Sequence, residues 1–155
     1  MTQQNALLRK GLETRLPGGK PLTVPANASS EDALDHFCVR NGVTCAGAHL
    51  IIDLYGAKRL NDIEHIEATL RRCVTAAEAT LLHIHLHHFQ PTGVSGVAVL
   101  AESHISIHTW PEAGYAALDV FMCGKANPDA CVPILREAFE VKRIAVSELL
   151  RGQGL

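Results

Sequence analysis

Residues 97–123 read VAVLAESHISIHTWPEAGYAALDVFMC, a run in which apolar side chains alternate with small or polar ones. Alternation with a period of two is typical of a strand that is buried on one face. Residues 97–110 are therefore expected to form one strand, which Pro111 ends, and residues 114–123 are expected to form another. The whole stretch predicts a β-sheet.

The first of these strands carries an unusual amount of polar chemistry. Two isoleucines are expected on one face, while His104, Ser106 and His108 lie on the other. Ser103 stands between a glutamate and a histidine at the same place. An ordinary strand does not crowd so many reactive side chains together, so this stretch is the first candidate for a functional site.

The flanking sequence supplies two helices and further strands. Apolar residues at three- and four-residue steps predict a helix over residues 61–79, with Asn61 or Asp62 as its cap. A second helix is predicted from Asn127, with Pro128 at its first position. Strands are predicted over residues 48–56, 80–89 and 141–149. This order predicts an α+β fold, a two-layer α/β sandwich whose antiparallel sheet carries its helices on one face.

The strand predicted over residues 80–89 is rich in histidine. Its alternation predicts one face with Leu82, Ile84 and Leu86, and an opposite face with His83, His85, His87 and Phe89. The histidines at 85, 87 and 88 have a spacing that suits zinc. However, no aspartate follows them, and no second cluster of His, Asp or Cys has ligand spacing. A polar strand face that lines a pocket is therefore favoured over a metal site.

Length and composition exclude several classes of protein. A chain of 155 residues with 47% hydrophobic and 19% charged residues suits one globular domain. Its formal net charge of -2 and the lack of a basic run argue against binding to nucleic acid or acidic membranes. No apolar stretch is long enough to span a membrane. Five cysteines without a CxxC pair indicate the reducing cytoplasm, without a disulfide framework or a cysteine zinc site.

The chain divides into an extension and a domain. Residues 1–45 contain a stretch rich in Gly, Pro and Ser and are expected to form an N-terminal extension, packed on the domain or partly mobile. Within it, a short helix is predicted from Ser29 or Ser30 to Asn41-Gly42. Residues 46–155 are expected to form the domain itself.

The sequence Glu102-Ser103 suggests a chain that cleaves itself. A serine hydroxyl can attack the preceding carbonyl and convert the amide into an ester, given a strained turn, a base and a donor for the oxyanion. Loss of the α proton then expels the ester, and the serine becomes dehydroalanine and finally a pyruvoyl group, with release of ammonia. A pyruvoyl carbonyl forms a Schiff base with a substrate amine and accepts electrons when carbon dioxide leaves.

Residues 92–124, TGVSGVAVLAESHISIHTWPEAGYAALDVFMCG, closely resemble the core of prokaryotic S-adenosylmethionine decarboxylases, and a looser resemblance extends over residues 47–152. The resemblance implies a pyruvoyl-dependent decarboxylase that makes decarboxylated S-adenosylmethionine for spermidine and polyamine synthesis. It also implies a two-layer α/β sandwich, a homodimer of cleaved protomers with active sites near the interface, and no metal.

Carried over residue by residue, the resemblance assigns the self-processing machinery. Cleavage is expected between Glu102 and Ser103, with Ser103 becoming the pyruvoyl group of a chain of residues 103–155. His108 is implied as the processing base, and Ser95 of the GVSG motif is implied to assist the ester step. An imidazole titrates in the range that a processing base needs.

The same resemblance implies the residues that act on the substrate. Cys123 matches the acid that returns a proton to the substrate carbon after decarboxylation. Glu112 matches the carboxylate that holds the ribose hydroxyls, and Phe89 matches an aromatic ring that stacks on adenine. From the residues alone, buried core positions are the favoured interpretation of Cys123 and Phe89.

Two alternatives stay open at this point. Asp53 stands where many family members have glutamate, and a carboxylate shorter by one methylene changes substrate contacts. The chain can therefore be a pyruvoyl-dependent ornithine or arginine decarboxylase, with Asp53 or Asp119 meeting the distant cation of that substrate. It can also be a regulatory homologue without turnover, although the presence of both His108 and Cys123 argues against this.

Overall fold

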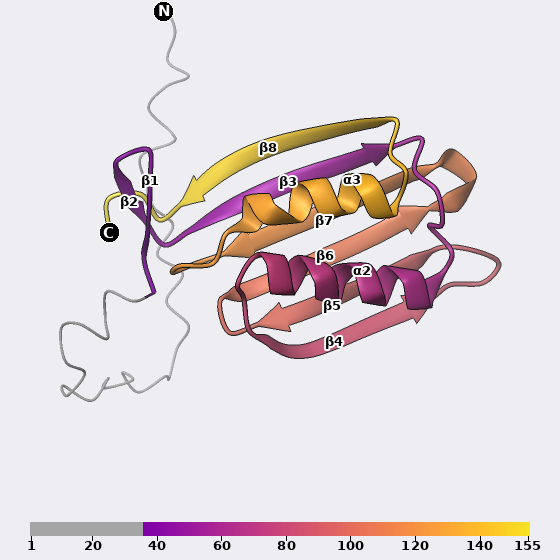
Figure 1. Ribbon diagram of the computed structural model, residues 1–155, viewed down its shortest axis with the longest axis horizontal. Helices are drawn as coiled ribbons and strands as arrows, with labels where there is room; N and C mark the ends of the chain where they lie inside the picture. Colours follow the sequence, from indigo (N-terminus) through magenta and orange to yellow (C-terminus); the bar gives the residue numbers. More distant parts are fainter. Residues whose placement is uncertain (1–35) are drawn as a thin grey trace, which may run out of the picture.

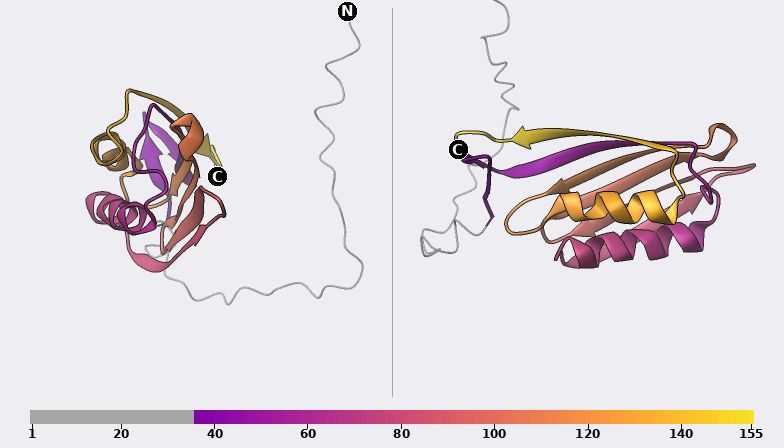
Figure 2. Two further views of the ribbon diagram at one scale, coloured as in Figure 1. Left: turned by 90° about the vertical axis from the view of Figure 1, so that its right-hand side faces the viewer. Right: turned by 45° about the horizontal axis from the view of Figure 1, so that its top comes forward.

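The computed structural model describes residues 36–155. A six-stranded antiparallel sheet has the strand order β4-β5-β6-β7-β3-β8, and both helices cover one of its faces (Figures 1 and 2). The strands are β3 (Gly47–Tyr55), β4 (Leu81–His88), β5 (Val94–Leu100), β6 (Ser103–Trp110), β7 (Tyr115–Met122) and β8 (Arg143–Arg151). The helices are α2 (Ile63–Ala76) and α3 (Cys131–Ala138). This arrangement confirms the predicted two-layer α/β sandwich.

The first helix forms where its cap and its apolar spacing predict. The carboxylate of Asp62 accepts a hydrogen bond from the backbone N–H of His65 at 3.0 Å, which satisfies one of the unpaired donors of the first turn. Ile66, Leu70 and Cys73 recur at four- and three-residue steps and are fully buried. Burial of this apolar stripe packs α2 against the sheet.

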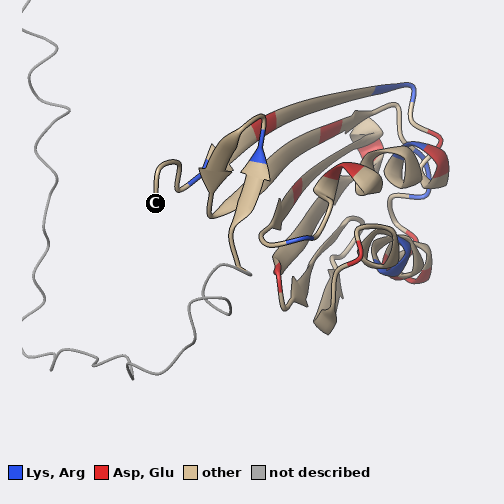
Figure 3. Ribbon diagram, turned by 60° about the vertical axis from the view of Figure 1, so that its left-hand side comes forward, with Lys and Arg blue, Asp and Glu red and all other residues tan. Residues whose placement is uncertain are grey.

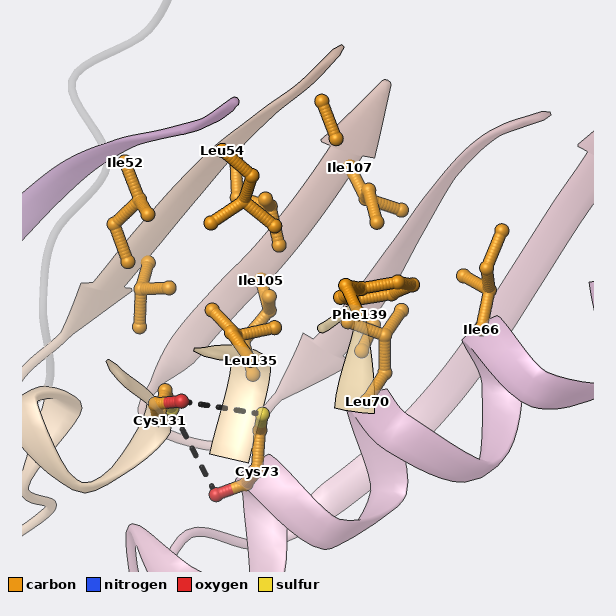
Figure 4. Close-up of a cluster of buried hydrophobic side chains, with 14 of the residues drawn as sticks. Ile52, Leu54, Ile66, Leu70, Cys73, Ile105, Ile107, Cys131, Leu135 and Phe139 are labelled. Atoms are coloured by element: carbon orange, nitrogen blue, oxygen red, sulfur yellow. Dashed lines mark hydrogen bonds between the residues drawn. The ribbon is translucent and has the colours of Figure 1, made fainter. Parts of the chain in front are cut away.

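The hydrophobic core fills the space between the sheet and the two helices (Figure 4). Phe139, which follows α3, is fully buried there among side chains from the strands and from α2. Ile105 and Ile107 of β6 also point into the core and are fully buried. Since strand side chains alternate, His104, Ser106 and His108 lie on the opposite side, as predicted. We call this side, opposite α2 and α3, the free sheet face.

Charged residues are concentrated on the helices and the connecting loops, whereas the strands are mostly uncharged (Figure 3). On the helices, Arg71 pairs with Glu67 at 2.7 Å and Arg72 pairs with Glu137 at 3.0 Å. Exposed pairs of this kind contribute at most about 1 kcal/mol each, so they keep the helical layer solvated rather than hold the fold. Within the part that the structure describes, no helix is long and apolar enough to cross a membrane.

The single strand predicted over residues 97–110 is wrong, because this stretch forms two strands. A tight turn at Ala101 and Glu102 separates β5 from β6, and Leu100 pairs directly with Ser103. The turn contains no Gly, Pro or Asn, so the sequence gives no turn signal there. The first of these two strands, β5, begins at Val94, three residues before the predicted start at Val97.

Two smaller predictions also fail. Leu82 is 64% exposed instead of facing the core, because the pairing with β5 jumps between Leu81 and His83 and leaves Leu82 as the extra residue of a β-bulge. Ile84 and Leu86 keep their predicted direction and pack against the core. The second helix starts later than predicted, since Asn127 caps a 3-10 turn over Pro128–Ala130 that precedes α3.

The predicted helix ending at Asn41-Gly42 is replaced by a hairpin where the structure describes it. Cys38–Arg40 (β1) pairs antiparallel with Val43–Cys45 (β2). Asn41 and Gly42 both have positive φ, 52° and 77°, the conformation of a two-residue hairpin turn that Asn-Gly strongly favours. The start of that helix, at residue 29 or 30, and the rest of the extension up to residue 35 lie outside the described residues.

Candidate active site

The peptide bond between Glu102 and Ser103 lies at the end of the turn that joins β5 to β6. Only Ala101 and Glu102 form this loop. Ser103 has a backbone φ of +138°, a conformation that costs a side-chain-bearing residue about 1–3 kcal/mol. The fold therefore holds the backbone in a strained geometry at the bond predicted to break.

Hydrogen bonds hold Glu102 at both its backbone and its side chain. The backbone N–H of Cys123 donates to the carbonyl oxygen of Glu102 at 2.9 Å. A donor in this place stabilises the negative charge that develops on a carbonyl oxygen during nucleophilic attack. The backbone N–H and the hydroxyl of Thr80 donate to the Glu102 carboxylate at 2.8 and 3.1 Å. Thr80 was not predicted, because nothing in the sequence links it to a turn 22 residues later.

The hydroxyl of Ser103 lies beside the ring of the next residue, with its Oγ 3.3 Å from Nδ1 of His104. Met122, at the end of β7, pairs with Ser103 across the sheet, and this register brings Cys123 next to Glu102. The sequence placed His104 on the polar face of its strand but assigned it no role. The fold thus brings Ser103, Glu102 and Cys123 together.

A cavity of about 470 Å³ opens at this place. Ser103 and Cys123 line it together with the aromatic rings of Phe37 and Phe121 and the side chain of Leu155. Burial raises the pKa of the Cys123 thiol above its ordinary value, and the negative charge of Glu102 adds to this effect. The thiol is therefore protonated at neutral pH and can give up a proton to a bound molecule.

A second cluster lies at the opposite end of β6. Oγ of Ser95 and Nδ1 of His108 are hydrogen-bonded at 2.8 Å, because these residues face each other across the β5–β6 ladder. Both line a cavity of about 320 Å³ with Phe89, Trp110 and Glu112. Phe89 is 47% exposed and is therefore not a core residue. Four residues predicted from the resemblance, and Trp110, are thus gathered in one place.

The two clusters are far apart within one chain. Ser103 and His108 are five residues apart on β6, which corresponds to about 17 Å at a rise of roughly 3.4 Å per residue. Two side chains on one extended strand cannot close such a gap. His108 therefore does not reach Ser103 of its own chain, although the sequence predicts that it assists cleavage there.

The two aspartates considered as substrate ligands are engaged within the sheet. The Tyr115 hydroxyl donates to Asp53 at 2.5 Å, and this bond to the carboxylate raises the pKa of Tyr115 to about 12. Asp119 accepts from the hydroxyl of Ser106 at 3.1 Å and lies 3.0 Å from Nε2 of His49. Neither aspartate lines either of the two cavities.

The histidines of β4 lie mostly on one face of their strand. His83, His85 and His87 are exposed along the free sheet face, and within residues 36–155 no three His, Cys, Asp or Glu side chains gather as ligands. The ring of His87 packs edge-on against Phe89 at a centroid distance of 4.7 Å. At least this histidine thus supports an aromatic side chain of the second cluster.

Comparisons with known proteins identify the family of this chain and agree with its fold. Residues 48–152 match the family described as S-adenosylmethionine decarboxylase. A protein of Thermomicrobium roseum named S-adenosylmethionine decarboxylase proenzyme is 46% identical over 108 residues, which cover 68% of this chain and 93% of the relative. A Methanococcus vannielii protein of the same name is 47% identical over 109 residues, 68% of this chain and 89% of the relative. The crystal structure of adenosylmethionine decarboxylase from Aquifex aeolicus superimposes with a TM-score of 0.63 at 39% identity, covering 68% of this chain and 90% of that one.

Proposed function

The chain belongs to the S-adenosylmethionine decarboxylase family, and from that premise we propose that it cleaves itself between Glu102 and Ser103 and then decarboxylates S-adenosylmethionine. The product would supply aminopropyl groups for polyamine synthesis in the cytoplasm. The observation that carries this proposal is the strained φ of Ser103 next to a carbonyl that accepts the Cys123 N–H. Strain and an oxyanion donor are two of the three things that self-cleavage requires.

Cleavage starts with attack of the Ser103 hydroxyl on the carbonyl carbon of Glu102. The carbonyl oxygen becomes negative while it accepts the hydrogen bond from Cys123, and the C–N bond then breaks to leave an ester. In a second step His108 removes the α proton of residue 103, which expels the Glu102 carboxylate. Hydrolysis of the resulting dehydroalanine releases ammonia and leaves a pyruvoyl group on residue 103.

The position of residue 103 fits this prosthetic group, because it opens into the cavity of about 470 Å³ beside Cys123. A pyruvoyl group there would supply a carbonyl able to condense with the substrate amine and to accept electrons as carbon dioxide leaves. The protonated thiol of Cys123 then delivers a proton to the substrate carbon. Phe37 and Phe121 give this cavity an apolar wall beside that carbon.

A second copy of the chain completes the site in this proposal. Two copies pack against each other through their free sheet faces, about a two-fold axis that lies between the faces and runs perpendicular to β6. This axis brings the His108 end of β6 in one copy against the Ser103 end of β6 in the other. The separation of about 17 Å within one strand supports this arrangement, since a single chain holds only half of the required residues at each end. We therefore assign the enzyme as a homodimer with two composite sites.

The second cluster suits the nucleoside part of S-adenosylmethionine. The exposed ring of Phe89 offers a face for adenine, and the carboxylate of Glu112 suits the two ribose hydroxyls in the same cavity. The ring of Trp110 lines this cavity as well and offers an aromatic face for the sulfonium cation. Asp53 and Asp119 are bonded to other residues of the sheet, which favours this substrate over ornithine or arginine.

Phe89→Ala is expected to raise the KM for S-adenosylmethionine at least roughly tenfold, the loss of about 1–3 kcal/mol of stacking on a base. Self-cleavage should be unchanged, because the Phe89 ring lines the cavity but carries no group that takes or gives a proton in the cleavage steps. Steady-state kinetics of the purified variant measure this effect. Leu82→Ala is the matched control, since Leu82 is an exposed apolar residue of β4, the strand that Phe89 follows, and does not line the cavity. An unchanged KM for Phe89→Ala would contradict the proposed stacking of Phe89 on adenine.

The proposed substrate is tested by offering the purified, cleaved protein S-adenosylmethionine, ornithine and arginine separately. We expect carbon dioxide and a decarboxylated product from S-adenosylmethionine alone. Release of carbon dioxide only from ornithine or arginine would transfer the assignment to that substrate with the same pyruvoyl chemistry. A cleaved protein without turnover on any of the three would support the regulatory homologue.

A further inference from the structure

The ring of His104 lies within hydrogen-bond distance of the reacting hydroxyl, and no step described so far uses it. Neighbouring residues on a strand normally point to opposite faces. Here the unusual φ of +138° at Ser103 turns its side chain so that Oγ lies 3.3 Å from Nδ1 of His104. The strained backbone therefore does more than weaken the bond to Glu102, because it also places the hydroxyl beside a base.

The ring of His104 is held in place by the sheet. His104 pairs with Val99 of β5 and with Phe121 of β7, and its ring meets that of Phe121 edge-on at a centroid distance of 6.1 Å. A ring that its neighbours already hold in place loses little orientational entropy when it is positioned against the hydroxyl from which it takes a proton. A distance of 3.3 Å is longer than the best hydrogen bonds, but such contacts commonly shorten as the reaction proceeds.

We infer that His104 is the general base of the first cleavage step and acts within the chain that carries Ser103. The proton of the Ser103 hydroxyl moves to Nδ1 of His104 while Oγ bonds to the carbonyl carbon of Glu102. The imidazolium then returns this proton to the backbone nitrogen of Ser103 as the C–N bond breaks. Atoms and charge balance, and no other reactant is needed to reach the ester.

This inference rests on the proposed function and divides the work between two histidines. His104 forms the ester within its own chain, whereas His108 of the partner subunit removes the α proton from that ester. The hydrogen bond between Ser95 and His108 supports this division, because it holds His108 at the other end of the strand. Loss of either histidine stops cleavage, but at different intermediates and with different chain dependence.

The test follows cleavage of freshly made chains over time by denaturing mass spectrometry. His104→Ala should cleave about 100-fold or more slowly than the wild type, the usual contribution of a general base. His104→Asn should be as slow, because an amide can hold the Ser103 hydroxyl but cannot take its proton. His85→Ala, which removes an exposed histidine of the same free sheet face, should cleave at the wild-type rate. His104→Asn also provides a folded variant if alanine impairs folding.

Two further measurements separate the histidines. Hydroxylamine cleaves esters, so it should release fragments from His108→Ala but not from His104→Ala. Co-expression with a differently tagged Ser103→Ala chain should restore cleavage of His108→Ala chains, since the partner supplies an intact His108. It should not restore cleavage of His104→Ala chains.

Three results overturn the role of His104. They are wild-type cleavage of His104→Ala, recovery by His104→Asn, and release of fragments from His104→Ala by hydroxylamine. A wild-type chain that stays whole is a different result, because it refutes the proposed self-cleavage itself.

Discussion

Ser103→Ala is expected to remain a single chain of 155 residues, while the wild-type protein yields chains 1–102 and 103–155. The reason is that alanine has no hydroxyl to attack the Glu102 carbonyl, whatever strain the turn retains. Denaturing mass spectrometry of aged protein measures both outcomes. The second wild-type chain should also lack a free amino terminus, because its first residue has become a pyruvoyl group.

Ser106→Ala provides the matched control for this prediction. Ser106 lies on the same strand, but its hydroxyl donates to Asp119 on the free sheet face and is remote from the Glu102 carbonyl. This variant should therefore cleave as the wild type does. An intact wild-type chain that still turns over substrate would refute the pyruvoyl mechanism, and Ser103 would then have no role as its precursor.

The sandwich architecture was predictable because its causes are local. The alternation around Ile105 and Ile107 fixed one buried face of β6, and the apolar steps of Ile66, Leu70 and Cys73 fixed the buried stripe of α2. The turn at Ala101 and Glu102 was not predictable in the same way. Its conformation is imposed by pairing on both sides and not by residues that favour a turn.

The candidate site was predictable in its members but not in its arrangement. The ESHxxIH motif suggests that Ser103 and His108 act on each other, whereas an extended strand holds them about 17 Å apart. Spacing in sequence carries no information on which chain completes a site. The contact between Ser103 and His104 was equally hidden, because it depends on one backbone angle that departs from the strand geometry.

Cys123→Ala is expected to cleave itself yet to lose roughly 99% or more of its turnover, the usual contribution of a general acid. In cleavage, Cys123 contributes only its backbone N–H, which donates to the Glu102 carbonyl whatever the side chain is. Its part in turnover is the thiol proton, which alanine lacks. Comparing the cleavage time course with kcat on the cleaved fraction separates the two roles.

The charge state of Cys123 gives this prediction a pH dependence. Burial, and then the charge of Glu102, raise the pKa of the thiol, so the protonated form persists as the pH rises through neutrality. Turnover limited by this proton should therefore fall only above the ordinary pKa of a thiol. Cys38→Ala is the matched control, because Cys38 lies against Cys45 in the β1–β2 hairpin and does not line the cavity. If Cys123→Ala decarboxylates at the wild-type rate, another group donates the proton.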